Sequence, residues 1–325
     1  MAVAHACPIV SLRDTNHLMR DVLSDVLAVT RLGATVLAQA ELVAPFGLAV
    51  DPMSEAAIHI VQRGMCWRRA QGGRRPTRLS QGDLVMVCGA GHAIMDSPST
   101  PVLPYAEVLR NMPRRLEKLP AHRRDETTVV LCGKYLFEHR GPHPLISLLP
   151  TVIHLRAHET ERHPQLPPLL SLLRMEAMQP GSGSELVVPR LMDTLLIFVV
   201  RAWLEGQPVG AGGWFGALRD PAIARALSLI HETPSDPWQV ESLAKRVGQS
   251  RATFSRRFHE LVGEPPLAYV TRWRMCLAAK LLSDSSRSLE EIACVVGYES
   301  AAALSKAFKR QYRVAPAHFR ERGSS

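Results

Sequence analysis

The hydrophobic pattern of the 325-residue chain changes near its middle. From about residue 34 to 153, apolar residues form short runs bounded by Gly, Pro and Asp, as in 56–61, 83–88 and 127–133. Such runs are typical of strands in a sheet that folds on itself. After about residue 169 the apolar residues recur at helical spacing. The pattern therefore predicts an α+β protein with a strand-rich N-terminal part and a helical C-terminal part.

A helix is expected over about 187–204, between glycine-containing breaks at 180–184 and 206–213. Its apolar residues recur in steps of three and four, which is the spacing of a short coiled-coil seam. The seam consists of Val188, Leu191, Leu195, Phe198 and Ala202. Neighbouring apolar residues widen this face. The helix therefore either pairs with a second copy of the chain, which we favour, or packs on its own domain.

The last third of the chain repeats itself at an offset of 49 to 50 residues. In each copy an apolar stripe predicts a helix, a glycine permits the left-handed backbone that ends it, and a serine suits the N-cap of the next helix. Each copy is therefore predicted to be a helix-turn-helix unit. The matching positions are Leu243-Ala244, Val247-Gly248 and Ser250 in the first copy, and Ile292-Ala293, Val296-Gly297 and Ser300 in the second.

The second helix of each predicted unit turns small and basic residues outward. In the first copy these are Arg251, Ala252, Ser255, Arg256 and His259. In the second copy they are Ala301, Ala302, Ser305, Lys306 and Lys309. A long helix starting at Pro265-Pro266 joins the copies, and a separation of about 34 Å would let one chain contact two successive major grooves of DNA. The alternative is a plain helical bundle with a solvated basic face.

Composition supports a polyanionic partner and argues against disulfide-rich, zinc-ribbon, secreted and membrane-spanning proteins. Lys and Arg number 39 against 30 Asp and Glu, which gives a net charge of +9. The six cysteines are scattered without a CxxC pair, so neither a disulfide scaffold nor a zinc ribbon is expected. The N-terminus lacks the basic start of a signal peptide, and no apolar run approaches a membrane span of about 20 residues. We expect a cytoplasmic protein without a membrane partner.

The C-terminal residues resemble the AraC/XylS family of bacterial transcription regulators over roughly Arg219 to Arg320. The motifs that carry the resemblance are Ser242-Leu243-Ala244, Gly248-Gln249-Ser250, Arg256-Arg257-Phe258, Gly263-Glu264-Pro265-Pro266, Trp273-Arg274-Met275, Ile292-Ala293, Gly297-Tyr298-Glu299-Ser300 and Phe308-Lys309-Arg310. The resemblance implies two helix-turn-helix units on a long helix and double-stranded promoter DNA as partner. It also implies base-facing positions for Ala252, Ser255, Arg256, Ala301, Ala302, Ser305 and Lys306.

The two units have different expected roles in DNA recognition. Arg256 can bond bidentately to guanine O6 and N7, which is worth about 1–3 kcal/mol of discrimination. Ala301 and Ala302 offer only methyl contact, so the second unit is expected to contribute mainly phosphate anchoring. Arg257 lies on a different face, where it binds a phosphate or an acidic neighbour. The anchoring cations of the second unit are Lys306, Lys309 and Arg310.

The N-terminal strands resemble the small β-barrel, cupin-type sensor domains of one AraC subgroup. The resemblance rests on Gly82-Asp83-Leu84-Val85, Gly91-His92, Asp96-Ser97-Pro98, Leu131-Cys132-Gly133, His143-Pro144-Leu145 and Leu148-Leu149-Pro150. A catalytic cupin offers an H-x-H pair, a Glu and a later His, whereas His59 is followed by Ile60-Val61. This departure argues against dioxygenase-type metal chemistry.

A zinc site is an alternative for this domain. His92, Cys132 and His143 lie at or just after predicted strands, and imidazole and thiolate together suit Zn²⁺. Their separations of 40 and 11 residues are not a diagnostic ligand spacing. Otherwise the two histidines are turn residues and Cys132 is a small buried hydrophobe.

These observations predict a one-component transcription regulator rather than an enzyme. Residues 1–168 form the cupin-like sensor domain, 169–219 a helical linker and dimerisation segment, and 220–325 the DNA-binding domain. Promoter DNA, a second copy of the chain and an unknown small-molecule effector are the expected partners, and RNA polymerase remains open as another. The alternatives are a metal- or redox-responsive regulator of the same architecture and a cupin enzyme fused to a DNA-binding domain.

Overall fold

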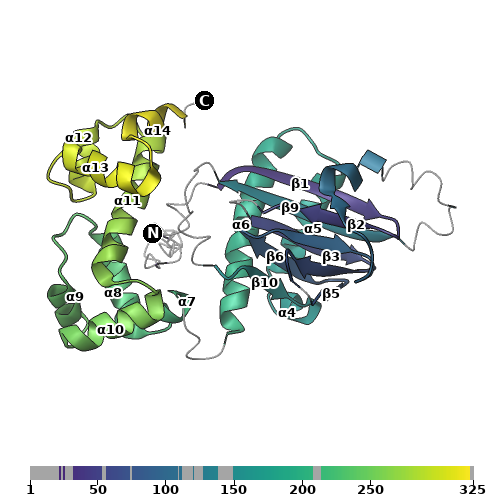
Figure 1. The fold of residues 1–325 in the computed structure, drawn as a ribbon, viewed down its shortest axis with the longest axis horizontal. Helices are drawn as coiled ribbons and strands as arrows, with labels where there is room; N and C mark the ends of the chain where they lie inside the picture. The colour runs from purple at the N-terminus through teal and green to yellow at the C-terminus, as the bar shows by residue number, and fades with distance from the viewer. Residues whose placement is uncertain are drawn as a thin grey trace, which may run out of the picture.

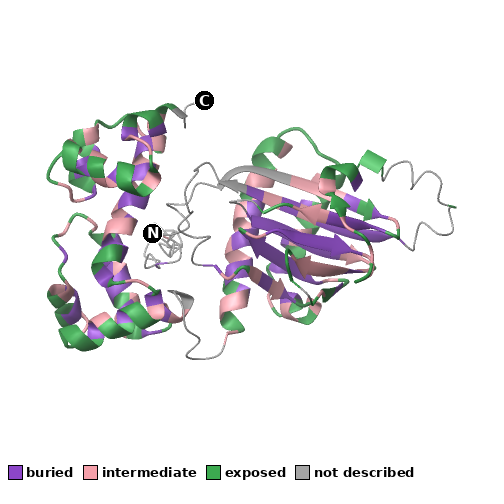
Figure 2. Cartoon of the chain, in the orientation of Figure 1, coloured by how far each residue is buried: buried purple, intermediate pink, exposed green. Residues whose placement is uncertain are grey.

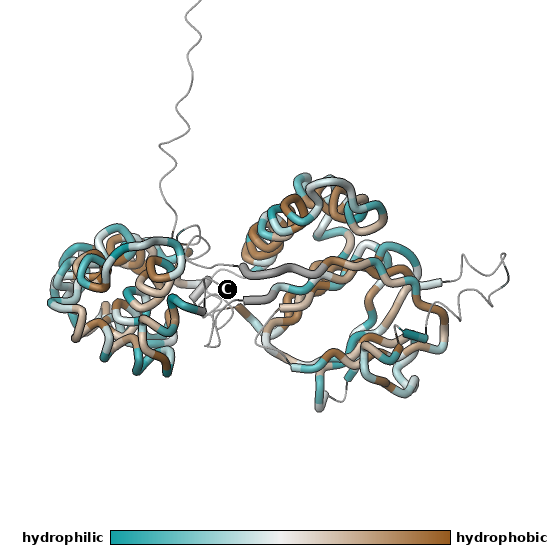
Figure 3. The backbone as a smooth tube through the Cα atoms, turned by 90° about the horizontal axis from the view of Figure 1, so that it is seen from above, coloured by the Kyte–Doolittle hydropathy of each residue, from teal (hydrophilic) through white to brown (hydrophobic). Residues whose placement is uncertain are grey.

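The computed structural model divides the chain into a strand-rich lobe and a helical C-terminal lobe (Figure 1). The two lobes also lie side by side in the view from above (Figure 3). None of the helices in the described part is long and apolar enough to cross a membrane. The described residues are 22, 25, 32–52, 56–73, 75–108, 110–111, 120, 127–137, 149–207 and 214–322.

The strands of the first lobe form two five-stranded sheets. The first sheet has the order β1-β9-β3-β6-β10, and the second has the order β5-β4-β7-β2-β8. The chain changes sheet several times, and at Gly64, where φ is +79°, it passes directly from a strand of the first sheet to a strand of the second. The strands are β1 (Leu32–Leu42), β2 (Gly47–Val50), β3 (Ala56–Arg63), β4 (Met65–Ala70), β5 (Thr77–Ser80), β6 (Leu84–Cys88), β7 (His92–Met95), β8 (Leu103–Pro104), β9 (Thr128–Phe137) and β10 (Val152–Leu155).

The strand-rich N-terminal part and the helical C-terminal part are confirmed, with one difference in the strand pairing. The described strands pair as two separate sheets and not as one closed barrel. Successive residues of a strand point to opposite sides of the sheet. Because β3 and β6 carry consecutive apolar residues, the first sheet is apolar on both faces. Val61 and Val85 point toward the second sheet, whereas Ile58 and Met86 point toward the helices. The central strands of this sheet are therefore buried almost throughout (Figure 2).

Two helices cover the outer face of the first sheet, α5 (Leu166–Met178) and α6 (Ser184–Glu205). The helix expected over 187–204 is therefore confirmed as part of α6. Its predicted seam packs partly inside the chain, because α6 covers this face of the sheet, and three of the five seam side chains stay half-buried. Leu195 and Ala202 are buried. The other seam residues pack against the same core, and they are Val188, Leu191 and Phe198.

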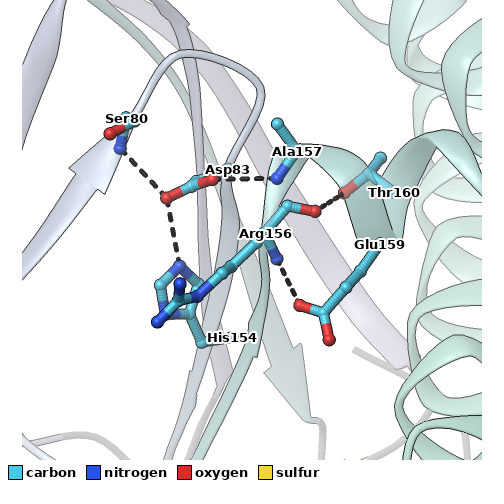
Figure 4. A network of polar contacts seen from close by, with 7 residues as sticks. All are labelled: Ser80, Asp83, His154, Arg156, Ala157, Glu159 and Thr160. Atoms are coloured by element: carbon cyan, nitrogen blue, oxygen red, sulfur yellow. Dashed lines mark hydrogen bonds and ion pairs between the residues drawn. The ribbon is translucent and has the colours of Figure 1, made fainter.

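A buried carboxylate joins the second sheet to the start of the helical layer (Figure 4). Asp83 follows Gly82 in the turn between β5 and β6. It accepts hydrogen bonds from Ser80 N at 3.0 Å and from His154 Nε2 at 3.2 Å. It also accepts one at 2.9 Å from the backbone N–H of Ala157, where helix α4 (Ala157–Glu161) begins. Asp83 thereby fixes the path of the chain from the sheets into the helices.

The C-terminal lobe contains the predicted duplication. Helices α9 and α10 form the first helix-turn-helix unit, α12 and α13 form the second, and α11 joins them (Figure 1). Gly248 and Gly297 adopt the expected positive φ of +70° and +75°. Ser250 and Ser300 each accept a hydrogen bond at 3.2 Å from the backbone N–H three residues later. The helices are α7 (Trp214–Ala217), α8 (Pro221–Glu232), α9 (Val240–Arg246), α10 (Arg251–Val262), α11 (Pro266–Asp284), α12 (Leu289–Val295), α13 (Ala301–Tyr312) and α14 (Pro316–Arg322).

Helix α11 begins at Pro266 as predicted, and its buried side differs from one end to the other. Leu267, near its start, is 42% exposed. Trp273 packs into the core of the first unit, whereas Met275 and Ala278 pack into the core of the second. Because two cores meet different parts of this helix, its buried side changes along its length, and a single apolar stripe does not describe it.

Candidate nucleic-acid interface and sensor pocket

Helix α10 presents the predicted contact residues of the first unit to solvent. Phe254 and Phe258 are fully buried on the opposite side, so the helical period fixes which side faces outward. The outward side chains line one open depression of the surface. They are Arg251, Ala252, Ser255, Arg256 and His259, all exposed except for the half-buried Ser255.

The ion pairs of this face leave its cations accessible. The Arg256 side chain is 72% exposed, and its Nε lies 4.0 Å from Oε1 of Glu260 on the same helix. Arg251 Nε lies 2.7 Å from Oε1 of Glu241 in α9. Exposed pairs of this kind contribute about 0–1 kcal/mol. Either guanidinium can therefore exchange its carboxylate for a phosphate or a base edge at little cost.

Arg257 has the acidic neighbour that was one of its two expected partners. Its guanidinium pairs with Asp220, which is buried at the start of α8. Asp220 also accepts hydrogen bonds from the N–H groups of Ala222 and Ile223, both at 3.0 Å. Arg257 thus ties α10 to α8 and belongs to the scaffold of the first unit.

Helix α13 presents the predicted residues of the second unit in the same way. Leu304 and Phe308 are fully buried, and the cations lie on the exposed side. Ala301 and Ser305 are half-buried, and the exposed positions are Ala302, Lys306, Lys309 and Arg310. The contacts of these side chains with DNA stay a prediction. The exposed cations and the burial of the opposite face agree with it.

The two sheets of the first lobe are together called the sandwich below. A cavity of about 310 Å³ lies between them. Small side chains leave this room, since five of the twelve wall residues are alanine or glycine. His59 and Cys132 are polar wall residues on the first sheet, and Asp51, Tyr105 and Lys134 add further polar groups. A mostly apolar cavity with a few polar groups is the usual form of a small-molecule site. The small wall residues are Ala38, Ala49, Ala57, Ala106 and Gly133.

Three polar side chains form a hydrogen-bonded chain that starts at this wall, with both histidines buried and Cys132 half-buried. His59 Nε2 lies 2.8 Å from His92 Nε2, and His59 Nδ1 lies 3.3 Å from Cys132 Sγ. Burial lowers the pKa of His59 to about 3 and that of His92 to about 4. Burial raises the pKa of the Cys132 thiol to about 12. The cavity wall therefore offers neutral imidazole and neutral thiol groups at ordinary pH.

The predicted zinc ligands are brought together only in part. His92 and Cys132 both contact His59, but at opposite ring nitrogens, and His143 lies outside the described residues. Within the described part of the chain, no three His, Cys, Asp or Glu side chains stand in an arrangement that could hold a metal ion. The zinc site stays a prediction. Sequence reasoning missed the central role of His59, because only the strand pairing of β3 with β9 brings it to Cys132.

The duplicated, capped and outward-facing basic helices define a DNA-binding protein of the helix-turn-helix class that carries a cupin-like domain. Two family matches agree with this assignment. Residues 21–205 match the Cupin family, and residues 243–322 match the Helix-turn-helix domain family.

Relatives with the same architecture extend over nearly the whole chain. An AraC-like transcription regulator from Streptomyces antibioticus is 30% identical over 306 residues, which cover 93% of this chain and 98% of that protein. The HTH-type transcriptional regulator AlkR from Acinetobacter baylyi is 31% identical, over 81% of this chain and 87% of its own. A solved structure also matches, the DNA-binding domain of AdpA in complex with a target DNA. Its sequence is 37% identical to this chain over 30% of this chain and 88% of that one, with a TM-score of 0.29. The chain belongs to the AraC family of DNA-binding transcription regulators with a cupin-type N-terminal domain.

Proposed function

We propose that this regulator contacts two successive major grooves of promoter DNA, one with α10 and one with α13. The duplication carries the proposal: both helices are capped by serine, bury aromatic or aliphatic side chains on one side and turn cations outward on the other. Arg256 supplies base discrimination from the first unit, and Lys306, Lys309 and Arg310 anchor the second unit to phosphates. Because its DNA partner is there, the protein works in the cytoplasm.

Capture of fragmented genomic DNA by the full-length protein at near-physiological salt tests this function. Enrichment of a few promoter fragments is the expected result, because base contacts add to the phosphate attraction. Uniform recovery of all fragments would mean that only phosphates are bound.

We further propose that a small, largely apolar effector binds in the cavity between the sheets. The small wall residues and the neutral His59 and Cys132 groups favour a compact, largely apolar body, and Asp51 and Lys134 add one acidic and one basic side chain at the wall. Ala106→Phe at the exposed edge of the cavity should fill the space without disturbing the buried core. Native mass spectrometry after incubation with a cell extract should then show a bound molecule on the wild type alone. Equal binding to both proteins would place the effector elsewhere.

The third part of the proposal is a homodimer. We place its interface on α5 and the start of α6, and not on the α6 seam that the sequence favoured. Large apolar side chains are exposed there, which is unusual for a monomer surface. Met175→Glu with Leu186→Glu should yield monomers in analytical ultracentrifugation, and Leu267→Glu on α11 should leave the dimer intact. A monomeric wild type would contradict the proposal. The patch consists of Leu172 (48% exposed), Met175 (62%), Met178 (56%), Leu186 (75%) and Val187 (42%).

A further inference from the structure

The two helix-turn-helix units have separate apolar cores that meet only along α11. The core of the first unit includes Val270 and Trp273 of this helix, and the core of the second begins at Met275. Arg274 therefore stands at the point where one core ends and the other begins. Since the described cores do not merge here, no direct apolar contact between them holds the units together, and polar contacts that bridge the units add to what their shared packing on α11 provides.

Arg274 supplies such contacts with all three nitrogens of its guanidinium. Nε donates to the carbonyl of Pro234 at 2.7 Å, and Nη2 donates to that of Asp236 at 2.8 Å. Both carbonyls belong to the segment that leads from α8 into the first helix-turn-helix unit. Nη1 donates to the carbonyl of Gly297 at 3.2 Å, inside the turn of the second unit. One half-buried side chain thus joins both units to the helix between them.

The backbones of the two units also touch at this point. A Cβ atom added to Gly297 would lie 2.7 Å from Cα of Ser235 and 2.9 Å from Nη2 of Arg274. Real Cβ atoms do not approach other atoms so closely, so the turn of the second unit and the loop before the first have no room between them. Gly297 therefore serves two purposes, since its φ of +75° also ends α12.

We propose that Arg274 is a positioning residue that sets the spacing of the two half-sites this regulator accepts on DNA. The inference rests on the proposed function, in which α10 and α13 both contact the duplex. One base pair inserted between the half-sites turns the second by about 34° around the duplex, because a helical turn holds about 10.5 base pairs. A protein with fixed units follows that rotation only by breaking the Arg274 contacts or by losing DNA contacts. Loss of the guanidinium should therefore relax the spacing rule.

The test compares binding of full-length variants to an operator selected with the wild type and to copies with one base pair inserted or deleted between the half-sites. Arg274→Met keeps the reach of the side chain without its donors. Arg274→Lys keeps the charge but cannot reproduce the planar fork that meets three carbonyls. Lys280→Met is the matched control, because Lys280 is a cation of the same helix that bonds to Asp284 within α11, at 2.7 Å.

The wild type should bind the altered spacings at least tenfold more weakly than the selected operator. Arg274→Met should reduce that penalty by about fivefold, the effect of a net hydrogen-bond contribution of ordinary size. Arg274→Lys should lie between the two, and Lys280→Met should match the wild type. An isolated half-site should be bound equally by all four proteins.

Three results would overturn the role of Arg274 while leaving the two-helix contact intact. The first is an unchanged spacing profile in Arg274→Met, or in Arg274→Lys should the methionine variant fail to fold. The second is an equal loss of affinity on every spacing and on the isolated half-site, which would reflect charge or folding alone. The third is the same relaxation in Lys280→Met. A wild type that ignores the spacing would instead refute the two-helix contact itself, and the role of Arg274 with it.

Discussion

The buried histidine pair of the sandwich makes its stability depend steeply on pH. His59 and His92 are 4% and 3% exposed, and burial lowers their pKa values to about 3 and about 4 from the ordinary 6.5. Below pH 6.5 the unfolded chain binds protons that the folded domain excludes, so stability falls as the pH drops from 6.5 toward 4. At pH 5.0 the loss is about 2 kcal/mol for each ring, or about 4 kcal/mol for the pair. That is a large part of the stability of an ordinary domain.

Hydrogen exchange of the β3 and β9 amides measures this loss in the sandwich alone. The free energy of opening should be about 4 kcal/mol lower at pH 5.0 than at pH 7.5 in the wild type. The double variant His59→Gln with His92→Gln keeps polar groups at both positions but removes the titration, so its pH dependence should largely disappear. An equal pH dependence in both proteins would refute the assignment of neutral buried histidines.

Three further predictions concern the DNA-contacting helices and the thiols. Arg256→Ala should lose about 1–3 kcal/mol of discrimination among operator variants in binding titrations, and an unchanged preference would exclude the base contact. Lys309→Ala should weaken all sequences alike and flatten the slope of log affinity against log salt by about 1; a loss confined to one operator would contradict phosphate anchoring. Cys132, whose pKa burial raises to about 12, should resist iodoacetamide at pH 8 while exposed Cys294 is modified. Rapid alkylation of Cys132 in mass spectrometry would contradict this prediction and favour the redox-responsive alternative.

The helical lobe was predictable because its signals are local. In each unit a glycine and a serine at a fixed distance from an apolar stripe predict the turn. The capping box of α12 is just as local, because it pairs Ser288 with Glu291 three residues later. Such features need no knowledge of the rest of the fold. The outward residues of α10 and α13 follow from the same helical period.

The features that sequence reasoning missed depend on contacts between distant residues. His59 meets His92 and Cys132 from positions 33 and 73 residues away, through a strand register that no local pattern fixes. The bridging role of Arg274 could not be predicted either, because its acceptors are backbone carbonyls of distant segments. The α6 seam shows the converse: its spacing is that of a coiled coil, but its side chains pack wholly or in part against the core of the same chain.

Hydroxyl-radical footprinting of a selected operator tests the central claim most directly, because it reports every stretch of backbone that the protein covers. The two-unit account predicts two protected windows for each bound DNA-binding domain, on one face of the duplex and about 10–10.5 base pairs apart. A single window for each domain, with the second major groove open to cleavage, would contradict the claim that α10 and α13 both contact DNA.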